Sequence, residues 1–245
     1  MKDVMVVASR SFERHIALRV GTVLAASLLL LGVSTAKANS IVLTSNPYTF
    51  LNGGEFTAVT TPAGIFNGSY APSAIINGGF ETFCVQTTVY FDLGTSYSYT
   101  LANNDSKGNA LSLGAAYLYY EFGKGLLSGY NYLSTGSPSR NTDAGALQAA
   151  IWYFQGQPIP SGFPSIGSDP FVSLAIGAAG GTLADALAAN NGTYSVEILQ
   201  LTDGTYGCVQ NQLVLTQVPE TTSTLMLFGA ALTTLGFAGR KLRSK

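Results

Sequence analysis

The feature that most restricts how this chain can fold is a pair of apolar segments, one near each end. The first covers residues 20–33, follows a basic region and precedes Ala36-Lys37-Ala38. This order is typical of a secretory signal peptide, so we expect cleavage after Ala38 and assign residues 1–38 to the signal peptide. The apolar run is short for a bilayer span, and an uncleaved membrane anchor is the alternative.

The second apolar segment covers residues 225–238 and is followed by a basic cluster. A short apolar helix with basic residues behind it stays in the inner membrane with its charges in the cytoplasm. Residues 218–245 are therefore expected to form a hydrophobic sorting or anchor helix. The residues that carry this pattern are Val218, Pro219, Glu220 and Thr221 before the helix and Arg240, Lys241 and Arg243 after it.

This tail resembles the PEP-CTERM sorting signal, which joins a Pro-Glu signature, a hydrophobic stretch and an Arg/Lys cluster. The chain departs from the family at Thr221 and Thr222, where proline and serine are usual. The resemblance implies processing by an exosortase, a membrane protease that cuts near the motif, in a host that makes exopolysaccharide. A plain C-terminal membrane anchor is the alternative.

Residues 39–217 remain for folding, which suits one ordinary domain or two small ones. This segment has three basic residues (Lys107, Lys124 and Arg140) against ten acidic ones, a net charge of −7. Nucleic-acid binding needs basic patches, so the composition argues against a nucleic-acid partner. An acidic surface suits an exported, soluble domain.

Residues 39–217 contain no histidine, because the only one, His15, lies in the expected signal peptide. The lack of histidine excludes Ser-His-Asp and Cys-His catalysis and histidine-bound metal. The two cysteines of the chain cannot build a zinc site unaided, and no loop has the spacing of an EF-hand. We therefore expect neither an enzyme nor a bound cofactor or metal.

The hydrophobic patterns predict a β-rich α+β domain, like a sandwich or a barrel, with two or three inserted helices. β-branched and aromatic residues between turn signals predict strands within residues 39–66. Two more strands are expected at 80–94 and 96–101, around a turn at Asp92-Leu93-Gly94. Two closing strands are expected at 194–202 and 210–216.

Helical patterns occupy the middle of the domain. The first covers residues 110–122. The second is expected to be capped by Asp143 and to end near Phe154, before Gly156 and Pro158. The third covers residues 170–190, where three glycines weaken or break the helix.

The second helix carries an unusual pair of side chains. Gln148 and Trp152, the only tryptophan of the chain, lie one turn apart on the same face. Leu147, Ile151 and Phe154 share the adjacent face, which suits packing in a core. A glutamine beside the tryptophan of a well-patterned helix therefore needs an explanation of its own.

Cys84 lies on the strand that begins at residue 80, where it is expected to face the opposite side from Phe83 and Val85. Phe83-Cys84-Val85, followed much later by Leu147-Gln148-Ala149-Ala150-Ile151-Trp152, resembles the Cys-Gln thioester domains of bacterial surface proteins. The resemblance covers residues from about 78 to 217. The chain departs from it at Gln86, where an acid is more usual, and at Leu147, which replaces a threonine.

The resemblance implies an internal thioester between residues 64 apart in the sequence. In such a domain the Sγ of Cys84 attacks the side-chain carboxamide of Gln148 and ammonia leaves. Trp152 would shield the bond from water. The acyl group would later pass to an amine or hydroxyl of exopolysaccharide or of another surface, so the protein would be a covalent adhesin and not a turnover enzyme.

The cysteines leave two other readings open. An exported protein with two cysteines commonly forms one disulfide, here Cys84–Cys208, which would make Gln148 an ordinary polar residue at a helix edge. Two free thiols are the remaining possibility. The fold prediction is the same in each case.

A tyrosine-rich segment supports a second function, because tyrosine rings stack on sugars. The alternative is that these rings pack in the core, which we favour. The residues are Tyr117, Tyr119, Tyr120, Tyr130 and Tyr132.

The sequence thus predicts an exported cell-surface or extracellular-matrix protein that an exosortase processes after transient residence in the inner membrane. Its expected role is structural or adhesive in exopolysaccharide or biofilm, through a Cys84–Gln148 thioester. The alternative function is a disulfide-stapled carbohydrate-binding module without covalent chemistry.

Overall fold

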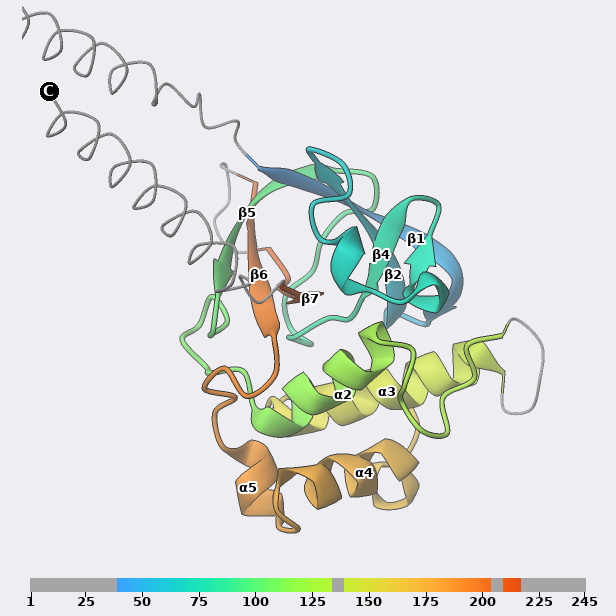
Figure 1. Cartoon of the computed structure of the whole chain (residues 1–245), viewed down its shortest axis with the longest axis vertical. Coiled ribbons are helices and arrows are strands. Elements are labelled where there is room, and N and C mark those ends of the chain that lie inside the picture. Colours follow the sequence, from blue (N-terminus) through green and yellow to red (C-terminus); the bar gives the residue numbers. More distant parts are fainter. Residues whose placement is uncertain (1–38, 134–138, 204–208, 217–245) are drawn as a thin grey trace, which may run out of the picture. The chain divides into compact units, whose positions relative to one another are not determined.

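A computed structural model describes residues 39–133, 139–203 and 209–216 (Figure 1). The expected signal peptide, the expected sorting tail and Cys208 lie outside the described residues. No helix within the described ranges is long and apolar enough to cross a membrane.

The strands form one seven-stranded antiparallel sheet in the order β3-β4-β2-β1-β5-β6-β7. Alternation of buried and exposed residues is clearest along β5, as expected for a strand with one face on a core. The strands are β1 (Ser40–Phe50), β2 (Gly53–Thr61), β3 (Ile75–Ile76), β4 (Gly79–Thr82), β5 (Ser96–Ala102), β6 (Val196–Thr202) and β7 (Gln212–Leu215).

The sheet curls until the segment after β4 meets β7. Cys84 and Gln212 form an antiparallel bridge there. The N–H of Val85 donates to the carbonyl of Asn211 at 2.9 Å. The contact covers the backbone edge that β7 would otherwise expose and gives the sheet a barrel-like closure. The prediction of a β-rich, barrel-like α+β domain is confirmed.

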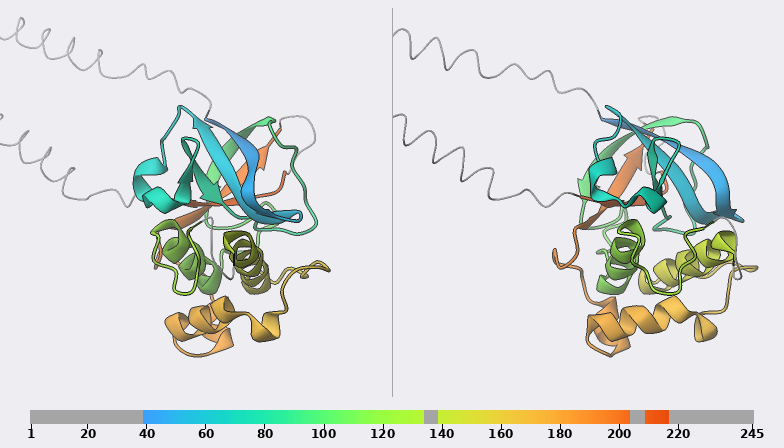
Figure 2. Two further views of the ribbon diagram at one scale, coloured as in Figure 1. Left: turned by 90° about the vertical axis from the view of Figure 1, so that its right-hand side faces the viewer. Right: turned by 45° about the vertical axis from the view of Figure 1, so that its right-hand side comes forward.

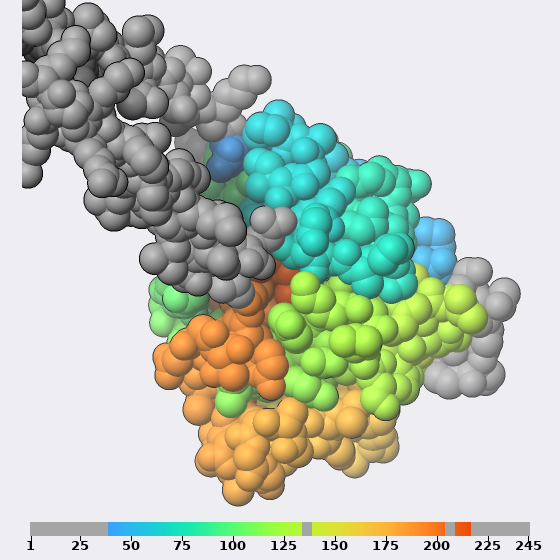
Figure 3. Space-filling model, viewed as in Figure 1, coloured from blue at the N-terminus to red at the C-terminus, as the bar shows by residue number. Residues whose placement is uncertain are grey.

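The helices form two layers at one end of the barrel (Figures 1 and 2). α2 and α3 lie directly against the strands, and α4 and α5 lie on the far side of α2 and α3. Figure 3 shows the same order on the surface, with blue and cyan strand segments above, light-green to yellow-green atoms of α2 and α3 in the middle, and golden atoms of α4 below. The helices are α2 (Leu113–Gly123), α3 (Arg140–Phe154), α4 (Pro170–Ala179) and α5 (Leu183–Leu187), and the 3-10 turns are η1 (Asn67–Ser69), η2 (Pro72–Ala74) and η3 (Ile166–Ser168).

The start of α3 corrects one sequence prediction. The helix begins at Arg140, one turn earlier than expected, and Ser139 is its N-cap, accepting from the N–H of Thr142. Asp143 lies in the first turn instead, where its carboxylate accepts from the N–H of Asn131 at 2.8 Å. Serine and aspartate are equally good caps, and the tertiary contacts of Arg140 decide between them.

Two other elements are shorter than predicted. The strand expected at residues 80–94 ends at Thr82, because the chain leaves the sheet after bridging β7 at Cys84. The helix expected at 170–190 breaks at Gly180 and Gly181, whose φ angles are +125° and +94°. Only glycine adopts such angles without strain, so the break follows from the glycines that the sequence showed.

The side chains of residues 83–85 alternate in direction and therefore contact two separate hydrophobic clusters. Phe83 and Val85 belong to the main core, whereas Cys84 belongs to a second cluster with Phe56 and Trp152. The opposite orientation predicted for Cys84 is therefore confirmed.

The tyrosine-rich segment packs inward. Tyr119 and Tyr130 are buried in the main core, and the rings of Tyr117, Tyr120 and Tyr132 pack against it. Core packing, the alternative that we favoured for these rings, is thus confirmed.

Candidate functional site

The structure brings Cys84 and Gln148 together. The Oε1 of Gln148 accepts from the backbone N–H of Cys84 at 2.9 Å, and its Nε2 donates to the backbone carbonyl of Cys84 at 2.8 Å. The amide of Gln148 thus pairs with the Cys84 peptide groups much as a neighbouring strand would. Neither residue has any exposed surface.

This geometry polarises the carboxamide of Gln148. The N–H of Cys84 points at Oε1, the atom on which negative charge develops when a nucleophile attacks the amide carbon. A backbone donor fixed in a dry site stabilises such a charge far more than water-exposed donors do. The main chain of Cys84 therefore activates the group that its own side chain would attack.

The thiol itself is held neutral. Burial raises the pKa of Cys84 to about 12, although a hydrogen bond from Gln212 opposes the rise. The Nε2 of Gln212 lies 3.6 Å from Sγ. A buried thiol with this pKa is protected from oxidants and alkylating agents, because the thiolate is the form that attacks those reagents.

Trp152 and β2 enclose the pair. Trp152 is 2% exposed and packs with Cys84 and Phe56. Gly53, the first residue of β2, lies so close that a Cβ there would be 2.9 Å from the Cγ of Gln148 and 2.9 Å from the Trp152 ring. Glycine is therefore required at this position for the hairpin of β1 and β2 to cover the site.

The N-terminal end of α3 fixes the helix on the same hairpin. Arg140 binds Glu55 of β2 through two hydrogen bonds of 2.7 Å each, and both side chains are buried. The Nδ2 of Asn141 donates to the carbonyl of Thr49 at 2.6 Å. The ring of Phe50 lies directly on Gly145. These contacts set the position of α3 along the strands and thereby the position of Gln148 two turns later.

A second buried acid accompanies Glu55, and the sequence did not reveal it. Glu81 of β4 accepts from the hydroxyl of Thr57 at 2.7 Å and from the amide of Asn46. Burial and the neighbouring charge of Glu55 raise the pKa of Glu81 to about 8. The only sequence signal was a single acid within each of two otherwise uncharged strands.

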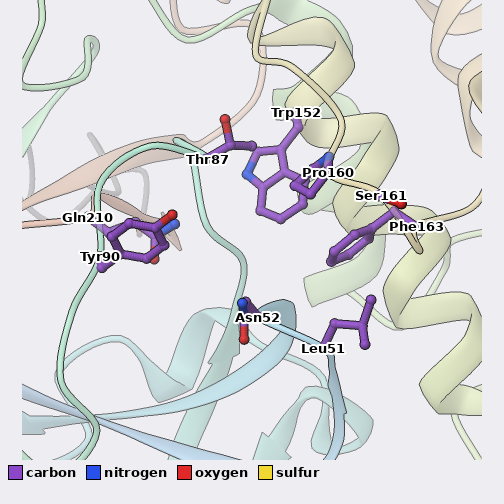
Figure 4. A pocket seen from close by; sticks show the side chains of 9 residues that line it. All are labelled: Leu51, Asn52, Thr87, Tyr90, Trp152, Pro160, Ser161, Phe163 and Gln210. Atoms are coloured by element: carbon purple, nitrogen blue, oxygen red, sulfur yellow. The ribbon is translucent and has the colours of Figure 1, made fainter.

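A groove runs along the outer side of Trp152 (Figure 4). It consists of a cavity of about 350 Å³ and a second of about 180 Å³, which share the residues Leu51, Asn52, Tyr90 and Gln210. Trp152 and Phe163 form one side of the larger cavity, and Tyr90 and Gln210 form the other. Sequence reasoning missed this groove because its walls come from four separate segments.

Comparison with known proteins adds one weak likeness. No protein-family model matches the chain, and no curated protein matches it. A solved structure, the N-terminal domain of the pilus tip adhesin Cpa of Streptococcus pyogenes, is similar over 76% of this chain and 98% of its own, with 14% identity and a TM-score of 0.36. Likeness at this level does not transfer residue roles from one chain to the other.

The disulfide alternative remains a prediction. Cys84 is a free thiol in the structure, and its partner in that alternative, Cys208, lies outside the described residues.

Proposed function

We propose that this protein is an exported surface or matrix adhesin whose domain closes an internal thioester between Cys84 and Gln148. One observation carries the proposal: the Gln148 amide is held by both peptide groups of Cys84 in a site without exposed surface. Any buried glutamine needs hydrogen-bond partners. A purely structural role would not require both partners to be main-chain groups of one cysteine.

The bond-forming step is balanced without an added reagent. The Sγ of Cys84 attacks Cδ of Gln148, the S–C bond forms, and the bond from Cδ to Nε2 breaks. Because the thiol is neutral, its proton passes to Nε2 as the S–C bond forms, and the nitrogen leaves as ammonia. Proximity replaces the high concentration of thiol that this unfavourable exchange would need in solution, and the N–H of Cys84 stabilises the oxyanion.

The stored acyl group is transferred by the same kind of nucleophilic exchange at Cδ. An amine or hydroxyl of a surface adds to Cδ, the bond from Cδ to Sγ breaks, and the proton of the acceptor returns to Sγ. The protein remains joined to its target, so each molecule reacts once, as an adhesin does and a turnover enzyme does not. Enclosure by Trp152 keeps water from consuming the bond first.

The ends of the chain support the place of action. A cleaved signal peptide at residues 1–38 would export the domain, and an exosortase would act on the tail after transient residence in the inner membrane. The net charge of −7 between residues 39 and 217 suits a domain that stays soluble outside the cell.

The test is the intact mass of the non-reduced mature protein, with Cys84→Ala as the matched control. We expect a deficit of about 17 Da, the mass of ammonia, in the wild type and none in Cys84→Ala. Methylamine should remove the deficit and leave a methylamide on Gln148.

Two other results would contradict the thioester. A deficit of about 2 Da that a reductant removes would establish the Cys84–Cys208 disulfide and favour the stapled carbohydrate-binding module. A mass equal to that of the unmodified chain would establish two free thiols.

A further inference from the structure

We propose that the groove beside Trp152 binds a neutral saccharide, and that a sugar hydroxyl is the acceptor for the acyl group of Gln148. The second half of this inference rests on the proposed thioester, whereas binding in the groove does not.

The groove has no charged lining. None of the described residues that line its two cavities is acidic or basic. Just outside, the ammonium group of Lys107 donates to the hydroxyl of Thr88 at 3.1 Å, beside the lining residue Thr87. The described lining itself therefore offers a cation no counter-ion.

An amine acceptor fits such a lining poorly. A lysine side chain has a pKa of about 10.4 and would enter as a cation. It would lose hydration without gaining a counter-ion, and it would find no carboxylate to take its proton before attack. A hydroxyl enters neutral and needs no counter-ion.

The shape and composition of the groove fit a sugar. Its volume lies in the range of small-ligand sites, with aromatic walls and a few polar groups. The rings of Trp152 and Phe163 meet edge to face, with centroids 4.9 Å apart, and Tyr90 opposite is 72% exposed. The exposed ring of Tyr90 offers an apolar face to the C–H surface of a pyranose, and the exposed amide of Asn52 offers hydrogen bonds to its hydroxyls.

Two unsatisfied groups point to a hydroxyl ligand. Among the described residues, the Nε1 of Trp152 and the Oγ1 of Thr87 are buried and find no hydrogen-bond partner. In Figure 4 the indole nitrogen lies on the side of Trp152 that faces Thr87. The indole can only donate, so its partner must accept, and a sugar hydroxyl accepts from the indole while bonding to a second hydroxyl. Unsatisfied buried groups are costly, and ligand binding would remove that cost.

The groove lining is one chain position away from a residue that packs on Gln148. Asn52 lines the groove, and the next residue, Gly53, touches Gln148 and Trp152. Trp152 separates the bound saccharide from Gln148, so its displacement would admit one hydroxyl to Cδ. That oxygen adds to Cδ, the bond from Cδ to Sγ breaks, and the hydroxyl proton passes to Sγ, which leaves an ester and a free thiol.

Binding is tested on Cys84→Ala mature protein, which cannot form the thioester. Trp152 is the only tryptophan, so tryptophan fluorescence reports on the groove alone. We expect a saturable change with α-1,4-linked or β-1,4-linked glucose hexasaccharide and none with an acetylated lysine amide. Tyr90→Ala should weaken binding about tenfold, the effect of losing roughly one aromatic contact.

A matched pair of exposed leucines controls for surface changes. Leu93 lines the smaller cavity and is 52% exposed, whereas Leu187 lies on α5 and is 46% exposed. Leu93→Ala should weaken binding and Leu187→Ala should not. No fluorescence change with either sugar, or equal effects of the two leucine variants, would overturn the saccharide site.

Acceptor choice is tested on wild-type protein by intact mass after incubation with the hexasaccharide and the lysine amide together. A sugar adduct that hydroxylamine releases supports the inference, because hydroxylamine cleaves esters and leaves amides. A lysine adduct alone overturns the hydroxyl acceptor while the thioester stands. A wild-type protein with no mass deficit that still binds sugar would overturn the thioester and leave the saccharide site in place.

Discussion

Two buried polar clusters hold α3 on the strands, and they differ in charge. At the start of the helix, Arg140, Glu55 and Glu81 form a charged cluster. Two turns later, Gln148 and Cys84 form a neutral one through amide hydrogen bonds. The charged cluster fixes the helix in place, at the cost of sensitivity to pH. The neutral cluster contains no carboxyl group that titrates, which under the proposed function suits a site that must keep a thioester unchanged.

The largest expected effect comes from breaking the charged cluster. Arg140→Met should lower the free energy of unfolding by about 3–5 kcal/mol, because it leaves Glu55 buried without its counter-ion. Urea denaturation measures the change. Lys107→Met, which removes an exposed cation, is the control and should change stability by less than about 0.5 kcal/mol. Equal effects of the two substitutions would mean that the buried pair contributes no more than a surface charge.

The next effect is the pH dependence of the charged cluster. Between the ordinary pKa of 4.5 and the folded value of about 8, folded Glu81 keeps a proton that the unfolded chain releases. The free energy of unfolding should therefore fall as pH rises through this window, by at most about 1.4 kcal/mol per pH unit. Urea denaturation at several pH values measures the slope.

Two variants separate the clusters in that experiment. Glu81→Gln should flatten the slope, whereas Gln148→Met should keep it, because the neutral cluster contains no carboxyl group. Burial also raises the pKa of Asp169, to about 6, so some slope remains in every variant. A slope that Glu81→Gln leaves unchanged would place the titrating group elsewhere.

A side chain at Gly53 would test how closely the neutral cluster is packed. Gly53→Ala should cost about 1–3 kcal/mol, because the new Cβ would displace Gln148 and Trp152. The same variant should lose the mass deficit expected for the thioester. Gly167→Ala is the control, since a Cβ there meets no atom of the described ranges within 4 Å. Retention of the full mass deficit in Gly53→Ala would show that the hairpin does not hold Gln148 in place.

The smallest effect is expected at the bridge between Cys84 and β7. Gln212→Leu should change stability by less than about 1 kcal/mol, because the Oε1 of Gln212 has no hydrogen-bond partner in the part of the chain that the structure describes. Asn211→Leu is the comparison and should cost about 1–3 kcal/mol, because the Oδ1 of Asn211 accepts from the N–H of Ser106 at 2.8 Å. Thermal or urea unfolding of the two variants distinguishes them, and a larger loss in Gln212→Leu would reverse the assignment.

The sequence predicted the neutral cluster better than the charged one. Gln148 stood out as a glutamine beside Trp152, the only tryptophan, and Cys84 stood out through the resemblance to Cys-Gln thioester domains. Alternation along a strand was enough to orient Cys84. Glu55 and Glu81 come together only through the register of β2 with β4, where Thr57 lies opposite Glu81. Register depends on packing of the whole sheet, which a pattern along one strand does not contain.

The same limit explains the element boundaries that the sequence misplaced. The strand pattern continues to residue 94, but the pairing that would maintain a strand ends when Cys84 meets β7. The side chain of Asp143 is suitable for an N-cap. Only the ion pair of Arg140 with Glu55 shows why α3 begins earlier.

The bridge between Cys84 and Gln212 also sets an order of events during biosynthesis. The two residues are 128 positions apart, and β7 is the last strand of the described domain. Contacts between such distant segments form late in folding, because the chain between them must first be ordered. The pocket around Cys84 is therefore completed only after nearly the whole domain is available to fold. Under the proposed function, we expect the chain to be exported without a thioester and to form the bond afterwards.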